Sequence, residues 1–181
     1  MTSRDGQSFR LWPEAFLRPG PQRPGTWFYG DHYQAWGLVE TKSVLDGAPD
    51  ELSIYATEST AGDTNVGRLR RYTLRVDGFV SVEAAAAGGQ LVTKPIVFEG
   101  KELVINFSTS AAGGIHVEIQ DADGTPIPGY ALEESEETFG DELARVVRWK
   151  SGPDLSALAG KPVRLRFVLK DADLYSIRFR P

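Results

Sequence analysis

The feature that most constrains this fold is a succession of short segments in which apolar and polar residues alternate between turns rich in glycine and aspartate. A period of two places one set of side chains on a buried face and the other on a wet face, as in antiparallel strands. Several such strands at close spacing indicate a β-sandwich or a barrel. We therefore predict an all-β chain with strands over 38–42, 51–58, 68–76, 79–82, 89–93, 102–108, 115–120, 144–149, 162–169 and 174–179.

The pattern of the sequence changes near residue 76, where irregular segments give way to regularly spaced alternating ones. Before that point, Ser3 to Phe9 has the composition of a tight turn that leads into a short strand. Residues 18–25 hold three prolines and two glycines, a composition that neither a helix nor a central strand tolerates. We expect two parts: a β segment over 1–75, and an antiparallel, jelly-roll-like β-sandwich domain over 76–181.

Charge and composition exclude several classes of function. The net charge is −5 and the basic residues do not form one block, whereas nucleic-acid binding needs a concentrated positive face. No apolar run approaches the roughly 18 residues of a membrane span. The chain has no cysteine, so disulfides, thiolate metal sites and a cysteine nucleophile are excluded.

Five segments resemble the C-terminal sandwich of bacterial glycoside-hydrolase-like proteins, in which a five-bladed β-propeller precedes the sandwich, as in the families that cleave fructans and arabinans. These segments are Thr93–Phe98, Asn106–Gly113, Val117–Gly124, Pro126–Tyr130 and Val163–Ser176. Residues 1–75 are similar to the end of such a propeller, and Ser3 to Gly6 followed by Phe9 and Trp12 looks like a blade hairpin.

The resemblance implies a carbohydrate-associated module and an extracellular or periplasmic location. In such enzymes the catalytic carboxylates lie mainly on earlier blades, which this sequence does not contain. The resemblance therefore favours a glycan-binding or accessory role, with a poly- or oligosaccharide as partner. The charge distribution and the lack of a long apolar run argue against nucleic acid and membrane as partners.

A dense group of aromatic residues is the first candidate site. Sugar rings stack on flat aromatic rings while neighbouring polar groups bind the hydroxyls. The alternatives are that these residues pack the junction between propeller and sandwich, or that they drive self-association through an exposed apolar patch. The candidate carbohydrate-binding residues are Trp27, Tyr29, His32, Tyr33 and Trp36.

Carboxylates near the aromatic group are candidates for catalysis. Glycoside hydrolysis needs two carboxyl groups roughly 5–10 Å apart. Asp31, Glu40 and Glu58 are the candidates, and Glu40 and Glu58 lie in alternating segments that could face one another. The alternative is that these groups are solvated or are ion-pair partners of nearby arginines such as Arg71.

A calcium site is a further candidate, because calcium prefers several carboxylate and carbonyl oxygens. Asp171 and Asp173 lie near the last predicted strand, which in sandwiches often pairs close to the first, near Asp77. The alternative is that these aspartates hold no metal, since their spacing lacks the full calcium-loop pattern. Three functions thus remain open: a glycan-binding module, a small glycoside hydrolase, and a structural or self-assembling domain.

Overall fold

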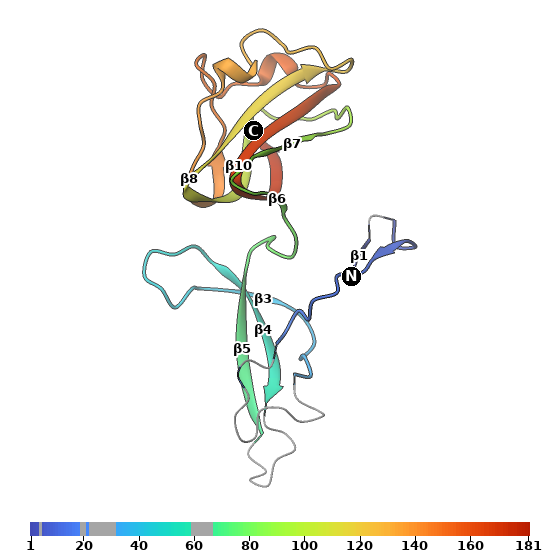
Figure 1. Ribbon diagram of the computed structural model, residues 1–181, viewed down its shortest axis with the longest axis vertical. Coiled ribbons are helices and arrows are strands. Elements are labelled where there is room, and N and C mark those ends of the chain that lie inside the picture. The colour runs from blue at the N-terminus through green and yellow to red at the C-terminus, as the bar shows by residue number, and fades with distance from the viewer. Residues whose placement is uncertain (4, 19–20, 22–31, 59–66) are drawn as a thin grey trace. The chain divides into compact units, whose positions relative to one another are not determined.

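The computed structural model describes residues 1–3, 5–18, 21, 32–58 and 67–181. The chain divides into two compact units, Met1–Leu74 (unit 1) and Arg75–Pro181 (unit 2). The described residues form antiparallel strands and short 3-10 turns (Figure 1), which confirms the predicted all-β class. In these described ranges, no helix has the length and apolar character needed to cross a bilayer.

The described part of unit 1 contains a hairpin and a three-stranded antiparallel sheet. The hairpin pairs β1 (Thr2–Ser3) with β2 (Phe9–Arg10), and its turn lies where the sequence predicts one. The sheet has the order β3-β4-β5, built from β3 (Val39–Thr41), β4 (Glu51–Glu58) and β5 (Arg68–Arg75).

Unit 2 contains a five-stranded antiparallel sheet in the order β6-β10-β8-β9, with β7 also paired to β10. Two short 3-10 turns, η1 (Leu132–Glu134) and η2 (Ser156–Leu158), lie outside it. In Figure 1 the two longest strands, β8 and β10, run side by side through the unit. The strands are β6 (Val82–Ala84), β7 (Gly89–Val92), β8 (Glu102–Asp121), β9 (Asp141–Val146) and β10 (Val163–Arg180).

The length of β8 and β10 corrects the sequence prediction. Segments 102–108 and 115–120 were expected to be separate strands joined by a turn at Gly113–Gly114, but they are one strand. Gly113 approaches the partner strand closely, because a Cβ built there would lie 2.3 Å from the backbone oxygen of Asp171. Glycine thus permits a bulge where a turn was predicted.

A register shift in β10 explains how one strand keeps its apolar residues inside. Up to Leu169 the buried residues of β10 are odd-numbered, whereas Ala172 and Leu174 are even-numbered. The pairing with β8 is interrupted between Lys170 and Ala172, and Asp171 has a φ of 43°. Between the pairs formed by Lys170 and Ala172, β10 has one residue, Asp171, whereas β8 has four, 110–113. This irregularity shifts the alternation of β10 by one position, so both halves of the strand face the core.

The apolar core of unit 2 is continuous and draws on both halves of the long strands. Trp149 is fully buried, donates its indole N–H to the carbonyl of Val117 at 2.8 Å, and packs edge-on against Tyr130. The buried members of the core are Ala84, Phe98, Leu103, Ile105, Phe107, Ile115, Val117, Ile119, Val147, Trp149, Leu155, Leu158, Val163, Leu165, Phe167, Leu169, Ala172 and Leu174.

Candidate functional site

Part of the aromatic group predicted to bind carbohydrate runs along β4 in unit 1. We call residues 32–36 the edge segment. Its backbone pairs antiparallel with β4, because Ala35 N donates to Tyr55 O at 2.7 Å and Thr57 N donates to Tyr33 O at 3.0 Å. His32, Tyr33 and Trp36 therefore lie on a backbone fixed by strand pairing. Trp27 and Tyr29 lie outside the described residues.

A two-residue bulge separates the edge segment from β3. Gln34 lies opposite Ala56, and Val39 lies opposite Ser53. The chain therefore advances five residues from Gln34 to Val39 while β4 advances only three. Gly37 lies in the bulge with a φ of 89°, a conformation that glycine adopts at little cost. Trp36 precedes it and is fully exposed, and Tyr33 is largely exposed. The edge segment thus presents two aromatic side chains to solvent.

Alternation along the strands assigns the neighbouring side chains to two faces of the sheet. Gln34 faces the same side as Ala56 across the pair, and by the period of two His32 and Glu58 share that side. Tyr33 belongs to the opposite side, where its N–H donates to the hydroxyl of Thr57. Gln34, His32 and Glu58 thus lie on one face of the sheet at this edge, and Tyr33 and Thr57 lie on the other.

Four polar side chains from the edge segment, β4 and β5 meet at the end of β4, and we call them the Glu58 cluster: His32, Glu58, Arg70 and Tyr72. Glu58 Oε1 lies 2.5 Å from Arg70 Nε and accepts a hydrogen bond from the Tyr72 hydroxyl at 3.0 Å. The Tyr72 ring lies 6.4 Å from the imidazole of His32, centroid to centroid. The carboxylate of Glu58 is thus held in place by a cation and a hydroxyl group.

His32 has two unusual properties within this cluster. Its φ of 64° lies in the left-handed region, which a residue other than glycine adopts at a cost. Its Nε2 atom is buried and has no hydrogen-bond partner among the described residues. A buried polar atom without a partner costs roughly 1–3 kcal/mol, and such atoms often mark a missing water, ion or ligand.

The two glutamates proposed as a catalytic pair lie on different strands: Glu58 ends β4, and Glu40 lies on β3 opposite the start of β4. Glu40 is opposite Leu52, which is six residues from Glu58 along the strand, or about 20 Å. Carboxyl pairs in glycoside hydrolases lie roughly 5–10 Å apart. The structure therefore does not bring Glu40 and Glu58 together, and the third candidate, Asp31, lies outside the described residues.

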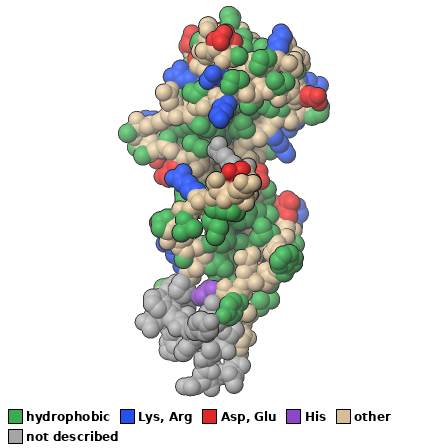
Figure 2. All heavy atoms as spheres, turned by 90° about the vertical axis from the view of Figure 1, so that its right-hand side faces the viewer, with side chains coloured by type: hydrophobic (Ala, Val, Ile, Leu, Met, Phe, Trp, Pro, Cys, Tyr) green, Lys and Arg blue, Asp and Glu red, His purple; other side chains and the backbone are tan. Residues whose placement is uncertain are grey.

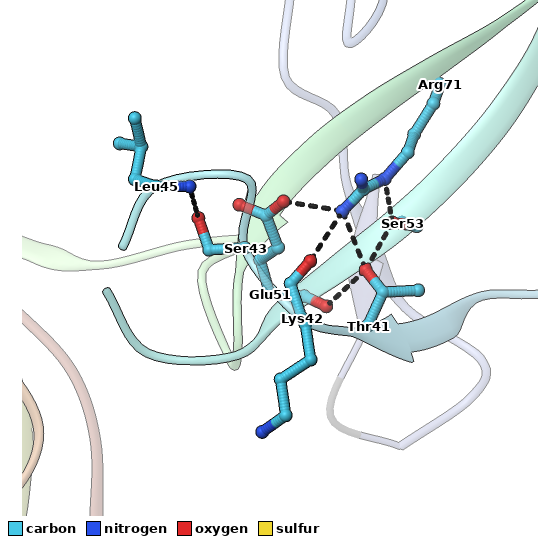
Figure 3. Close-up of polar contacts among 7 residues, drawn as sticks. All are labelled: Thr41, Lys42, Ser43, Leu45, Glu51, Ser53 and Arg71. Carbon is cyan, nitrogen blue, oxygen red and sulfur yellow. Dashed lines mark hydrogen bonds and ion pairs between the residues drawn. The ribbon is translucent and has the colours of Figure 1, made fainter. Parts of the chain in front are cut away.

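A polar network on the other face of the same sheet joins its three strands (Figure 3). Arg71 on β5 donates to Ser53 Oγ at 2.6 Å, to Thr41 Oγ1 at 2.8 Å and to Glu51 Oε1 at 2.6 Å. It also donates to the carbonyl of Lys42. Because the donors of Arg71 are matched by acceptors on β3 and β4, this network links the three strands of the sheet.

The three aspartates proposed as calcium ligands use their carboxylates or backbone in separate contacts within unit 2. Asp77 Oδ2 accepts a hydrogen bond from Ser176 Oγ at 2.8 Å, and Asp173 Oδ1 accepts one from Ser81 Oγ at 2.6 Å. Asp171 lies at the bulge of β10. Across the described ranges, no group of three or more histidine, aspartate or glutamate side chains is arranged to hold a metal ion.

Unit 2 has a buried ion pair of its own. Glu118 on β8 is almost fully buried and lies opposite Arg166 of β10 in the register. Its Oε1 contacts Arg166 at 3.3 Å and accepts a hydrogen bond from Gln120, and its Oε2 accepts one from the N–H of Leu132. Because both carboxylate oxygens are satisfied by protein groups, this pair joins strands and η1 rather than offering a binding group.

Sequence reasoning missed two members of the Glu58 cluster, Arg70 and Tyr72. They share a face of β5 by the period of two, which the sequence does show. What it does not show is the register of β5 against β4, which decides that this face meets Glu58. Comparisons with protein-family models, with curated proteins and with solved structures find no match for the chain.

Proposed function

We propose that the chain is a non-catalytic, carbohydrate-associated module that binds a poly- or oligosaccharide at the edge segment of unit 1. The observation that carries this proposal is the full exposure of Trp36 on a chain segment whose backbone is paired with β4. A flat ring held in this way can stack on a sugar ring with little loss of conformational entropy.

The finer architecture belongs to the same proposal. We infer that unit 2 is a jelly-roll-like sandwich and that unit 1 is the end of a propeller, as the resemblance implies. The antiparallel sheets of both units support this. An extracellular or periplasmic location follows from the same resemblance. The wide separation of Glu40 and Glu58 is the reason to prefer binding over hydrolysis.

Self-association is the second candidate function, and the exposed apolar residues of unit 1 favour it. Large hydrophobic side chains reach the surface in both units, and some are visible in Figure 2. Apolar surface marks interaction sites where it is contiguous. In unit 1 the exposed large hydrophobic residues include Phe9, Leu11, Trp12, Phe16, Tyr33, Trp36, Leu38, Val39, Val44, Leu45 and Leu69.

Affinity electrophoresis in gels that contain levan, arabinan or another soluble polysaccharide tests the proposal. We expect at least one polysaccharide to retard the wild-type chain and Trp36→Ala to lose most of that retardation. Phe139→Ala is the matched control, because Phe139 is an exposed aromatic residue of unit 2. Equal retardation of all three proteins, or no retardation by any polysaccharide, would refute the proposal. Concentration-dependent sedimentation without retardation would favour self-association.

A further inference from the structure

The two edges of the five-stranded sheet in unit 2 differ in charge. The sheet ends at β9 on one side and at β6 and β7 on the other, where β7 lies beside β10 (Figure 1). Three of the six residues of β9 are charged, namely Asp141, Glu142 and Arg145. By contrast, β7 has no charged residue and β6 has only Glu83. Charged edge strands resist pairing with another chain, whereas uncharged ones favour it.

The backbone of β7 carries hydrogen-bonding groups on the side that faces away from β10. Thr93, which follows β7, donates its N–H to the carbonyl of Leu165 on β10 at 2.9 Å. Because N–H groups alternate in direction along a strand, those of Gln90 and Val92 point away from β10. Among the residues of unit 2, all of which the structure describes, no strand pairs with this side of β6 or β7. We call residues 82–84 and 89–92 the β6–β7 edge.

The side chains of the β6–β7 edge are small or apolar and reach solvent. Val82 and Val92 are both exposed, and Gly89 and Gln90 between them are exposed as well. A β-branched residue suits a strand that pairs with another, and covering apolar surface is favourable. The edge therefore offers a second strand both backbone hydrogen bonds and apolar contacts.

Opposite charges lie at the two ends of the β6–β7 edge. At one end, Glu83 is opposite Asp173 of β10 in the register. At the other end, Lys94 lies between residues that bond to the start of β10, where Arg164 is. When two identical edges pair antiparallel, the acidic end of one copy lies beside the basic end of the other. A second copy of this chain is thus complementary to the edge in charge as well as in backbone.

We infer that two copies of this chain pair antiparallel through the β6–β7 edge and form one continuous sheet across a two-fold axis. A two-fold contact uses the same edge of both copies, and the charged β9 does not extend the sheet, so association ends at a dimer. Because the paired strands are short, we expect a weak dimer with a Kd on the order of 100 μM. The inference does not rest on the carbohydrate proposal, whose site is in unit 1.

Sedimentation of the full chain over a range of concentrations, with charge-reversal variants, tests the pairing. Glu83→Lys makes both ends of the edge basic and Lys94→Glu makes both ends acidic, so each should raise the Kd about tenfold. The double variant restores opposite charges at the two ends and should return the Kd to the wild-type value. Glu136→Lys reverses an exposed charge elsewhere in unit 2 and is the control.

Hydrogen exchange locates the contact in the same samples. The amides of Gln90 and Val92 should exchange fast in dilute solution and slowly in concentrated solution, whereas that of Thr93 should be slow in both. The inference is wrong if the wild type stays monomeric at about ten times the expected Kd, or if neither single variant weakens the dimer. It is also wrong if Trp36→Ala abolishes the dimer, because the contact then lies in unit 1.

Discussion

Unit 2 encloses a continuous apolar core, whereas in the described residues of unit 1 the only buried hydrophobic residues are Ile54 and Ala56. The described residues of unit 1 instead make polar contacts such as those of Arg71, and they include most of the exposed large hydrophobic residues that the structure describes. Apolar burial is the main source of stability in folded domains. The difference teaches that stability and the candidate binding surface are concentrated in different parts of the chain.

The largest expected effect comes from removing a ring from the core of unit 2. Phe107 is fully buried on β8, so Phe107→Ala should lower the free energy of unfolding of unit 2 by about 3–5 kcal/mol. Urea unfolding followed by NMR cross-peaks from each unit would measure it. A similar loss of unfolding free energy in both units would show that the two units unfold together and that stability is not concentrated in unit 2.

A smaller loss is expected from adding one methyl group at the bulge of β8. Gly113→Ala places a Cβ against the backbone of Asp171 and Lys170, which must then move. Overpacking of this kind costs about 1–3 kcal/mol. The same unfolding experiment measures the loss. Gly160→Ala is the control for space, since nothing lies within 4 Å of a Cβ there, although its φ of 76° adds backbone strain.

Loss of the Arg71 network should affect unit 1 alone. Arg71→Met removes the donor that Glu51, Ser53 and Thr41 share, and we expect unit 1 to lose about 1–2 kcal/mol. Arg68→Met on the same strand is the control, because Arg68 is exposed and surface changes usually stay within about 0.5 kcal/mol. An unchanged unit 1 would mean that the network adds nothing to the sheet.

The smallest effect concerns the β1–β2 hairpin. The backbone N–H groups of Ser8 and Gln7, with the hydroxyl of Ser3, hold the pKa of Asp5 well below its usual range. A lowered pKa means that the turn is stabilised while Asp5 is ionised and loses this support as the pH falls through the folded-state pKa.

NMR amide shifts of Gln7 and Ser8 should therefore stay constant from neutral pH down to the ordinary aspartate range near 4 and move only at still lower pH. In Asp5→Asn these shifts should differ from the wild type at neutral pH and should not titrate. Amide shifts that titrate near 4 in the wild type would contradict the lowered pKa.

The sequence predicted the positions of strands better than the connections between them. Alternation located β4, β5 and β7 within a residue or two. The strands β8 and β10 were each predicted as two strands, β8 because its Gly-Gly pair looks like a turn and β10 because its alternation is interrupted near Asp171. In the structure these residues form bulges. A turn and a bulge share residue types, and only the partner strand distinguishes them.

The candidate site was predictable only in part. Aromatic density indicated Tyr33 and Trp36, and the exposure of Trp36 agrees with a surface role. The grouping of Glu58 with Arg70 and Tyr72 depends on strand register, which spacing alone does not determine. The pairing of β3 with β4 places Glu40 far from Glu58. Strand pairing thus brings the Glu58 cluster together and keeps the predicted catalytic pair apart.

Hydrogen exchange of the full-length chain, with and without a polysaccharide that retards it, tests most directly the claim that unit 2 supplies stability and unit 1 supplies binding. We predict the slowest exchange in β8 and β10 and faster exchange in unit 1 without ligand. With ligand, added protection should be confined to residues 32–36 and 55–58. Protection added in unit 2 instead, or uniform exchange across both units, would contradict the account.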